Sequence, residues 1–402
     1  MGKRIAVGVI IIMLSITSGG CWDIRYLDEL AIVFAIGLDT SDSANLKVTV
    51  QVVNPTTVSL GSSKSGGGGN SAVTTYSETG PTFLEAIRKM TSKTSRALYF
   101  SHNQVLVIGE DLAKEGVRQL FDFIERDPAI RTDFYIVIAK GAKAADVLKI
   151  TTPVEMIPGT KIHDSIDNVE KKIGTSYKVS MKDIIQQINS GKQEIVAGSV
   201  EIVGDKKQGG SKQNIEEINP TTLLKLNGMA VFKHEKLEGF MTPGESKGLS
   251  WINNRIKNTV IHIPCEKEGT IAIEIMHSST KLKVKLQDNQ PSFSIHVRQE
   301  ANIGEIICSD LDISDKKTFE ILQKQFNEKI KKQIMNTVTK VQEMETDIFG
   351  FADLVNKKNP AYWKKNQHQW DGIFAKVPVT VEVETNIRRE GIRGKSYYQK
   401  NS

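Results

Sequence analysis

The 402-residue chain has little cysteine, almost no long hydrophobic runs and no strong excess of charge of one sign. Its 3 cysteines form no Cys-x-x-Cys pair and no cluster with histidine at zinc-ligand spacing, which excludes the usual zinc motifs. The formal net charge of +6 is too small to indicate nucleic-acid binding. The content of 39% hydrophobic and 25% charged residues is that of a folded protein, and the length favours more than one domain.

The main apolar run lies at the N-terminus and has the features of a secretory leader. Lys3 and Arg4 precede the run Ile5–Leu14, and the small residues 18–20 then lead to Cys21. A membrane-spanning helix needs about 20 apolar residues, and this run has roughly half that number. We therefore interpret residues 1–20 as a signal peptide. No later segment is long and apolar enough to span a membrane.

The residue that follows the leader decides between free secretion and anchoring. Cys21 comes directly after two glycines, so cleavage before it would make its thiol available for a diacylglycerol group. Ser18 stands at position −3, where Leu is usual, and Ser18 with Gly20 would also suit ordinary signal peptidase. We predict lipidation of Cys21, and the alternative is a free thiol on a soluble exported protein. The acyl chains of a bacterial lipoprotein would hold the protein permanently at a membrane.

The other two cysteines, Cys265 and Cys308, lie in the second half of the chain. An exported protein can carry a disulfide, but two cysteines without a spacing signature do not define one. We expect two buried free thiols, and a disulfide is the alternative.

The first domain is predicted to be α/β and to cover residues 21–204. Alternation and short apolar runs predict strands, and apolar residues three and four apart predict helices. The expected strands are 30–38, 46–53, 99–108, 134–139 and 195–203, and the expected helices are 83–90, 117–124, 143–149 and 181–189. The first two strands should form a hairpin. The glycine-rich stretch 61–70 is expected to be a loop, because it lacks the Gly-Lys-Ser/Thr of a phosphate-binding loop.

The rest of the chain is predicted to be a linker with a small middle subdomain at 205–258 and an α+β domain at 259–398. The middle part should hold a strand at 223–232, a turn at 233–236 and a short helix at 249–255. In the last domain, strands at 271–275, 282–286 and 293–297 predict an antiparallel sheet. An amphipathic helix over 319–341, capped by Asp312 or Ser314, should pack on that sheet, and a strand follows from 377 to 383.

No group of residues has the composition of a catalytic site. His102 lies between Ser101 and Asn103, but neighbours on a strand point to opposite faces and cannot form a triad, so we expect a structural histidine. His262 and two further histidines, His277 and His296, fall on predicted strands of one sheet, yet no carboxylate or cysteine completes a metal pattern. We therefore predict no enzyme activity, no cofactor and no metal.

A basic and aromatic cluster near the C-terminus comprises Tyr362, Trp363, Lys364, Lys365 and Trp370. Such residues could lie on a membrane surface, but a strand follows directly, so we favour packing of helix ends.

Several stretches resemble the GerAC-type family, the C subunits of spore germinant receptors. The resemblance begins at Cys21-Trp22-Asp23 and continues in the stretch 96–110, which reads RALYFSHNQVLVIGE. Further matching positions are Arg25, Leu27–Leu30, Ile36–Asp39, Phe121–Asp127, Arg131, Val379–Arg388 and Gly391. It therefore covers both predicted main domains.

The resemblance implies a lipoprotein on the outer face of the spore's inner membrane, with Cys21 as the lipidation site. It also implies assembly with a multi-spanning A subunit and a permease-like B subunit that is linked to nutrient recognition, and it implies no reaction. Whether this subunit contacts the nutrient itself is left open. A different hypothesis is an exported lipoprotein that binds a small ligand by itself.

Overall fold

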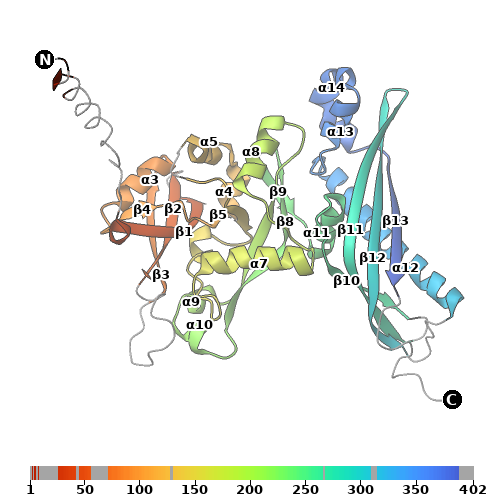
Figure 1. Cartoon of the computed structure of the whole chain (residues 1–402), viewed down its shortest axis with the longest axis horizontal. Helices are drawn as coiled ribbons and strands as arrows, with labels where there is room; N and C mark the ends of the chain where they lie inside the picture. Colours follow the sequence, from red (N-terminus) through yellow and green to blue (C-terminus); the bar gives the residue numbers. More distant parts are fainter. Residues whose placement is uncertain are drawn as a thin grey trace.

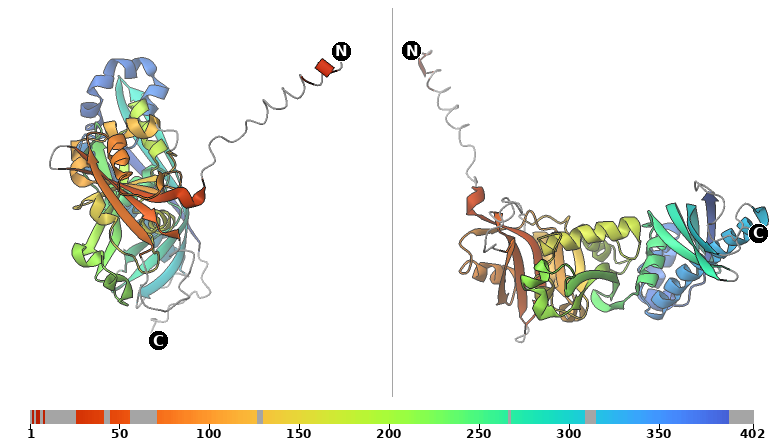
Figure 2. Two further views of the ribbon diagram at one scale, coloured as in Figure 1. Left: turned by 90° about the vertical axis from the view of Figure 1, so that its left-hand side faces the viewer. Right: turned by 90° about the horizontal axis from the view of Figure 1, so that it is seen from below.

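In the computed structural model, two β-sheets lie one after the other along the molecule (Figure 1). The structure describes residues 26–41, 45–55, 71–126, 130–265, 268–308 and 315–388, with a few isolated positions before residue 9. The first sheet has nine strands and the second has four. The right-hand view of Figure 2 shows an elongated body, with the second sheet at the opposite end from the strands β1 to β4. The mixed α/β class predicted from the sequence is confirmed.

The first sheet has the strand order β3-β2-β1-β5-β6-β7-β8-β9, and β4 pairs with the beginning of β1. Its centre is parallel, and both ends are antiparallel. The strands are β1 (Leu30–Thr40), β2 (Leu46–Val53), β3 (Val73–Gly80), β4 (Ala97–Tyr99), β5 (Val105–Gly109), β6 (Tyr135–Ala139), β7 (Val196–Gly204), β8 (Thr222–Lys233) and β9 (Lys236–Phe240). The predicted hairpin of β1 and β2 is confirmed.

Both faces of the central strands are buried, which explains their continuous apolar sequences. Along β5, Leu106 and Ile108 belong to one hydrophobic cluster, whereas Val105 and Val107 belong to another on the opposite face. This alternation follows from the two-residue period of a strand.

Helices cover these two faces. They are α3 (Phe83–Met90), α4 (Glu110–Glu115), α5 (Arg118–Arg126), α6 (Ala144–Val147), α7 (Pro158–Lys172) and α8 (Met181–Ser190). Helix α8, predicted over 181–189, begins with a capping box of Ser180 and Asp183, and it ends at Gly191 in the left-handed conformation. The sequence reading missed β3, α4 and α7, and it predicted β4 and β5 as one strand over 99–108.

The middle region does not form the separate subdomain that we predicted for residues 205–258. The strand β8 pairs with β7, and β9 pairs with β8, so both strands extend the first sheet. The short helices α9 (Lys206–Gly209) and α10 (Gln213–Glu216) lie between β7 and β8, and α11 (Pro243–Ile252) follows β9. The polar composition of 205–219 thus marks a connection between paired strands and not a domain boundary.

The second sheet has the order β10-β11-β12-β13, with bounds Thr259–Pro264, Gly269–Gln287, Gln290–Cys308 and Val379–Arg388. Two details of the sheet that we predicted for the last domain are wrong. The stretches 271–275 and 282–286 belong to one long strand, β11, whose pairing register shifts between Ile275 and His277. The sheet is also not purely antiparallel, because β13 pairs in parallel with β12.

The predicted amphipathic helix is α12 (Lys316–Glu343), which packs against α11 and β13. Its buried face comprises Leu322, Phe326, Ile330, Ile334, Thr337, Val338 and Val341. The N-cap is Asp315, whose carboxylate accepts a hydrogen bond from the Thr318 amide at 2.8 Å. Our cap residues Asp312 and Ser314 lie outside the described residues. The short helices α13 (Phe351–Lys358), α14 (Pro360–Asn366) and α15 (Trp370–Phe374) lead to β13.

A disulfide joins Cys265 to Cys308, so the expectation of two free thiols is wrong. Cys265 follows β10, and Cys308 ends β12 opposite Gly269, the first residue of β11. The bond therefore ties together the ends of three neighbouring strands. Sequence spacing did not predict it, because the long strands β11 and β12 carry the two residues back together.

Candidate functional site

Cys21, the predicted lipidation site, lies outside the described residues, as does the glycine-rich stretch 61–70. Within the described part of the chain, no helix is long and apolar enough to cross a membrane.

His102 lies on an exposed turn before β5, where its ring packs against Tyr99 with 5.8 Å between ring centroids. The neighbouring Asn103 is buried, and neither polar atom of its side chain has a hydrogen-bond partner. The geometry supports a structural role for this segment, which stays a prediction.

The three histidines on β10, β11 and β12 stand opposite different residues of the sheet. His262 faces Ala272, His277 faces Glu300, and His296 faces Lys281. On the neighbouring strand β13, His296 faces Glu382, and its ring nitrogen lies 2.9 Å from a carboxylate oxygen of that residue. Among the described residues, no group of three or more histidine, cysteine, aspartate or glutamate side chains could hold a metal ion.

The aromatic residues near the C-terminus are packed, as predicted. Trp363 and Trp370 are both buried and meet edge to face, with 5.5 Å between ring centroids. The indole of Trp370 donates a hydrogen bond to Asp347 at 3.0 Å. Lys364 and Lys365 remain exposed.

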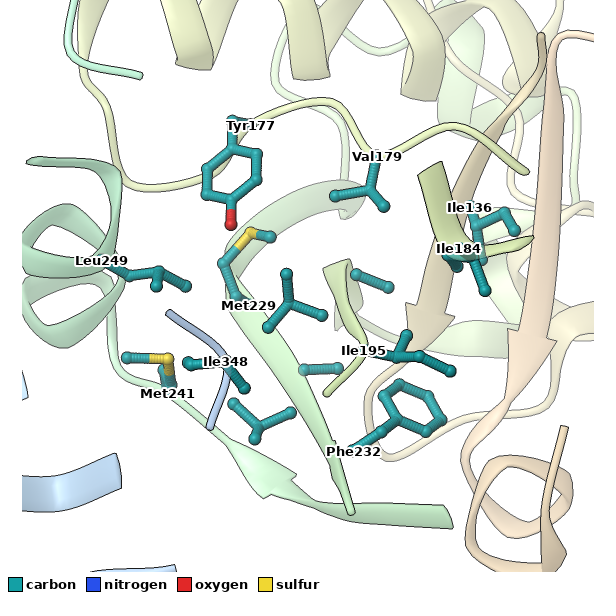
Figure 3. Close-up of a cluster of buried hydrophobic side chains, with 14 of the residues drawn as sticks. Ile136, Tyr177, Val179, Ile184, Ile195, Met229, Phe232, Met241, Leu249 and Ile348 are labelled. Carbon is teal, nitrogen blue, oxygen red and sulfur yellow. The ribbon is translucent and has the colours of Figure 1, made fainter. Parts of the chain in front are cut away.

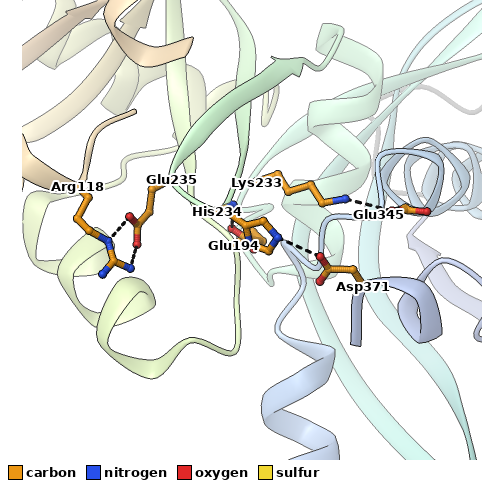
Figure 4. A network of polar contacts seen from close by, with 7 residues as sticks. All are labelled: Arg118, Glu194, Lys233, His234, Glu235, Glu345 and Asp371. Atoms are coloured by element: carbon orange, nitrogen blue, oxygen red, sulfur yellow. Dashed lines mark hydrogen bonds and ion pairs between the residues drawn. The ribbon is translucent and has the colours of Figure 1, made fainter. Parts of the chain in front are cut away.

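A network of polar contacts lies at the junction of the two sheets, around the turn between β8 and β9 (Figure 4). His234 and Glu235 both have positive φ angles, 49° and 67°, as the two central residues of a tight hairpin turn require. The turn was predicted at 233–236, but its contacts were not. Glu235 binds the guanidinium of Arg118, at the start of α5, through both carboxylate oxygens.

Residues of the same turn also contact residues in or next to α12 and α15, the helices near the second sheet. His234 lies between two carboxylates, with Glu194 before β7 at 3.3 Å and Asp371 of α15 at 3.2 Å. Next to it, Lys233 lies 3.1 Å from Glu345, which follows α12. Burial raises the pKa of Glu194, and a hydrogen bond from the His234 amide opposes this shift. One turn therefore connects α5, the entry to β7 and the C-terminal helices.

A cluster of buried hydrophobic side chains lies at the same junction (Figure 3). Met229 of β8, Met241 after β9, Leu249 of α11 and Ile348 are all buried there, and they belong to the same cluster as the core residues of both sheets. Since exposed ion pairs contribute only about 0–1 kcal/mol each, the apolar contacts supply most of the stability of the junction.

Asp347 is the buried polar centre of the junction. Its carboxylate accepts hydrogen bonds from the amides of Phe351 (3.0 Å) and Ala352 (2.7 Å) at the start of α13, as well as from Trp370. Burial raises its pKa to about 6 although these hydrogen bonds oppose the shift. The Glu194 amide also donates to the Asp347 carbonyl at 2.9 Å, which links the first sheet directly to this centre.

The contacts of this turn, the buried hydrophobic cluster and Asp347 together can hold the two sheets in a fixed relative position. Sequence reasoning missed His234 and Asp347, because their contacts across the junction are with residues far away in the sequence and neither residue lies in a motif.

Comparisons with known proteins cover the same two regions of the chain. The family models "Spore germination protein N-terminal domain" and "Spore germination B3/ GerAC like, C-terminal" match residues 23–202 and 227–391. Spore germination protein KC of Bacillus subtilis (strain 168) is 33% identical over 397 residues, which cover 98% of this chain and 97% of that protein. Spore germination protein B3 of the same organism is 25% identical over 383 residues, covering 94% of this chain and 95% of that protein.

The fold is also similar to that of a solved structure. The crystal structure of the GerBC protein aligns with a TM-score of 0.55 and 23% identity, covering 91% of this chain and 99% of that chain.

Proposed function

Because the chain belongs to the GerAC-type family of spore germination proteins, we propose that it is the lipid-anchored C subunit of a nutrient germinant receptor. In this proposal its role is non-catalytic, and it is needed for receptor assembly or for coupling the nutrient signal. The observation that carries the proposal is the 33% identity to a spore germination protein along 98% of the chain.

The anchor would be Cys21, acylated after removal of residues 1–20. The proposed location is the outer face of the spore's inner membrane, beside a multi-spanning A subunit and a permease-like B subunit. An anchor confines the protein to two dimensions, so that weak contacts with the membrane subunits act at a high effective concentration. Loss of the anchor should therefore weaken assembly without changing any contact surface.

The junction of the two sheets supports a coupling role. Its buried hydrophobic cluster and Asp347 connect both sheets into one continuous core. A rigid body of this kind would transmit a displacement at one end to a partner bound at the other end.

The test is a comparison of Cys21→Ala spores with wild-type spores in their response to nutrients. We expect the variant to lose most of the response, because unanchored protein leaves the membrane. Ser18→Leu is the control, since it places the usual residue at position −3 and should keep the response. A normal response of Cys21→Ala spores at normal receptor levels would contradict the proposal.

A further inference from the structure

A cavity of about 650 Å³ lies between the two sheets, on the side of α8. Its walls come from α8, from residues 252–255 after α11, from β11 and from α13. Tyr177 and Val179, drawn in Figure 3, form part of the wall. This volume lies within the range of small-molecule sites, which occur preferentially between domains.

The cavity has more cationic groups than available carboxylates. Arg255 is half-buried, and its guanidinium lies over the ring of Tyr177, 5.4 Å from the centroid. Among the described residues, neither Arg255 nor the two half-buried lysines of the wall, Lys178 and Lys192, forms an ion pair. Arg255 and Lys192 therefore lack a carboxylate partner, whereas Lys178 lies near the carboxylate of Asp167.

The two carboxylates of the wall already have partners. Asp183 accepts hydrogen bonds from the amide and hydroxyl of Ser180, at 2.9 and 2.7 Å, in the capping box of α8. Asp353 forms an ion pair with Lys357 at 2.6 Å. The wall has four basic residues (Lys178, Lys192, Arg255 and Lys357) and two acidic ones (Asp183 and Asp353), so its formal net charge is +2.

Two buried polar atoms of the wall also have no hydrogen-bond partner. They are Oε1 of Gln187 on α8 and the hydroxyl oxygen of Thr280 on β11. Both atoms have almost no accessible surface, so they belong to the closed part of the wall and a bound molecule would not contact them directly. The amide of Thr280 is already used, because it donates to Asn254 at 2.9 Å.

We propose that this cavity binds a small organic anion that carries a carboxylate or phosphate. The anionic group would bind Arg255, whose planar guanidinium is held against Tyr177 and suits bidentate contact with either acid. Lys178 and Lys192 would complete the charge balance. This site is independent of the anchor at Cys21.

The test is calorimetric titration of the purified full-length protein with malate, glycerol 3-phosphate and glycerol. Malate or glycerol 3-phosphate should bind, and the comparison of the two shows which acid is preferred. Glycerol and an equal ionic strength of sodium chloride should give no saturable signal. Arg255→Gln and, separately, Lys192→Gln should weaken binding about tenfold or more, as expected for loss of a charge-assisted contact.

Arg298→Gln is the matched control, because this arginine lies on the surface of β12 in an exposed ion pair with Glu384. It should bind the anion as the wild type does. The proposal is overturned if neither anion binds more tightly than chloride. It is also overturned if the single variants Arg255→Gln and Lys192→Gln both bind the anion as tightly as the wild type does. Failure here leaves the anchor proposal untouched, since that proposal is tested in spores by Cys21→Ala.

Discussion

Asp347 shows how a single buried residue determines the junction between the sheets. Its carboxylate starts α13 and holds Trp370, and its carbonyl accepts from Glu194. It is fully enclosed, which raises its pKa above the ordinary value of 3.8 to about 6. The folded protein therefore binds a proton at this residue more readily than the unfolded chain does.

This shift predicts a pH dependence that Asp347→Asn should remove. Because the folded pKa is the higher one, the contribution to stability is fully present below the unfolded pKa and is lost as pH rises toward 6. Between about pH 4 and 6, the free energy of unfolding of the wild type should fall relative to the variant by about 1.4 kcal/mol per pH unit. Denaturant unfolding at several pH values measures this difference.

The control for this experiment is Asp111→Asn, at an exposed aspartate in α4. It should follow the wild-type curve. Parallel pH curves for the wild type and Asp347→Asn would contradict the explanation.

The two residues with the clearest proposed roles differ in how far the sequence could predict them. Cys21 follows a leader and two glycines, and its lipidation, predicted from this local pattern, stays a prediction. Asp347 has local partners in the amides of Phe351 and Ala352, but Trp370 is 23 residues away and Glu194 lies in another part of the chain. Contacts of that kind form only when the fold brings distant segments together.

At the scale of elements, the packing of α11 on α12 depends on a glycine. A Cβ atom at Gly248 would overlap the hydroxyl of Thr337 and would lie 3.0 Å from the carbonyl oxygen of Gln333. That hydroxyl also donates to the Glu245 carbonyl at 2.8 Å. The two helices therefore approach closely only because position 248 has no side chain.

Gly248→Ala should destabilise the protein by about 1–3 kcal/mol, because overpacking forces the helices apart. Gly244→Ala in the same helix is the matched control, since its Cβ would contact only the Thr242 hydroxyl at 3.9 Å. That control should be neutral or slightly stabilising, as alanine favours helix. Thermal unfolding of both variants decides the matter, and equal melting temperatures would refute the role of Gly248.

The disulfide is the second prediction at this scale. It closes a loop across 43 positions of sequence, and in the chain-entropy description such a bond stabilises by roughly 2–4 kcal/mol. Mass spectrometry after alkylation without reductant should find no modified thiol at Cys265 or Cys308. The double variant Cys265→Ser/Cys308→Ser should lower the melting temperature. Full alkylation of both residues in native, unreduced protein would contradict the assignment.

The sequence predicted an element correctly where the apolar residues of that element repeat regularly. The amphipathic helix predicted over 319–341 was found as α12, because that helix packs one apolar face along its length. Strand β11 was divided in two because an irregularity near Ile275 interrupts its alternation. Helix α7 was missed because its sequence begins with Pro158-Gly159 and has few apolar residues.

At the scale of the whole molecule, the two sheets share one hydrophobic core. The fold class was predictable because each half has its own apolar periodicity. The continuation of the first sheet through β8 and β9 was not predictable, since the polar segment before them has the composition of a linker. The junction is therefore a property of the fold as a whole, and it is the feature that best supports a coupling role.

The central claim is that this rigid body works at a membrane through an acylated Cys21 beside multi-spanning partners. The most direct test is the intact mass of the protein extracted from spore membranes after gentle crosslinking. Our account predicts a chain that begins at Cys21, carries diacylglycerol and an N-acyl group, and is crosslinked to permease-like membrane proteins. A soluble, unmodified chain without membrane partners would contradict it.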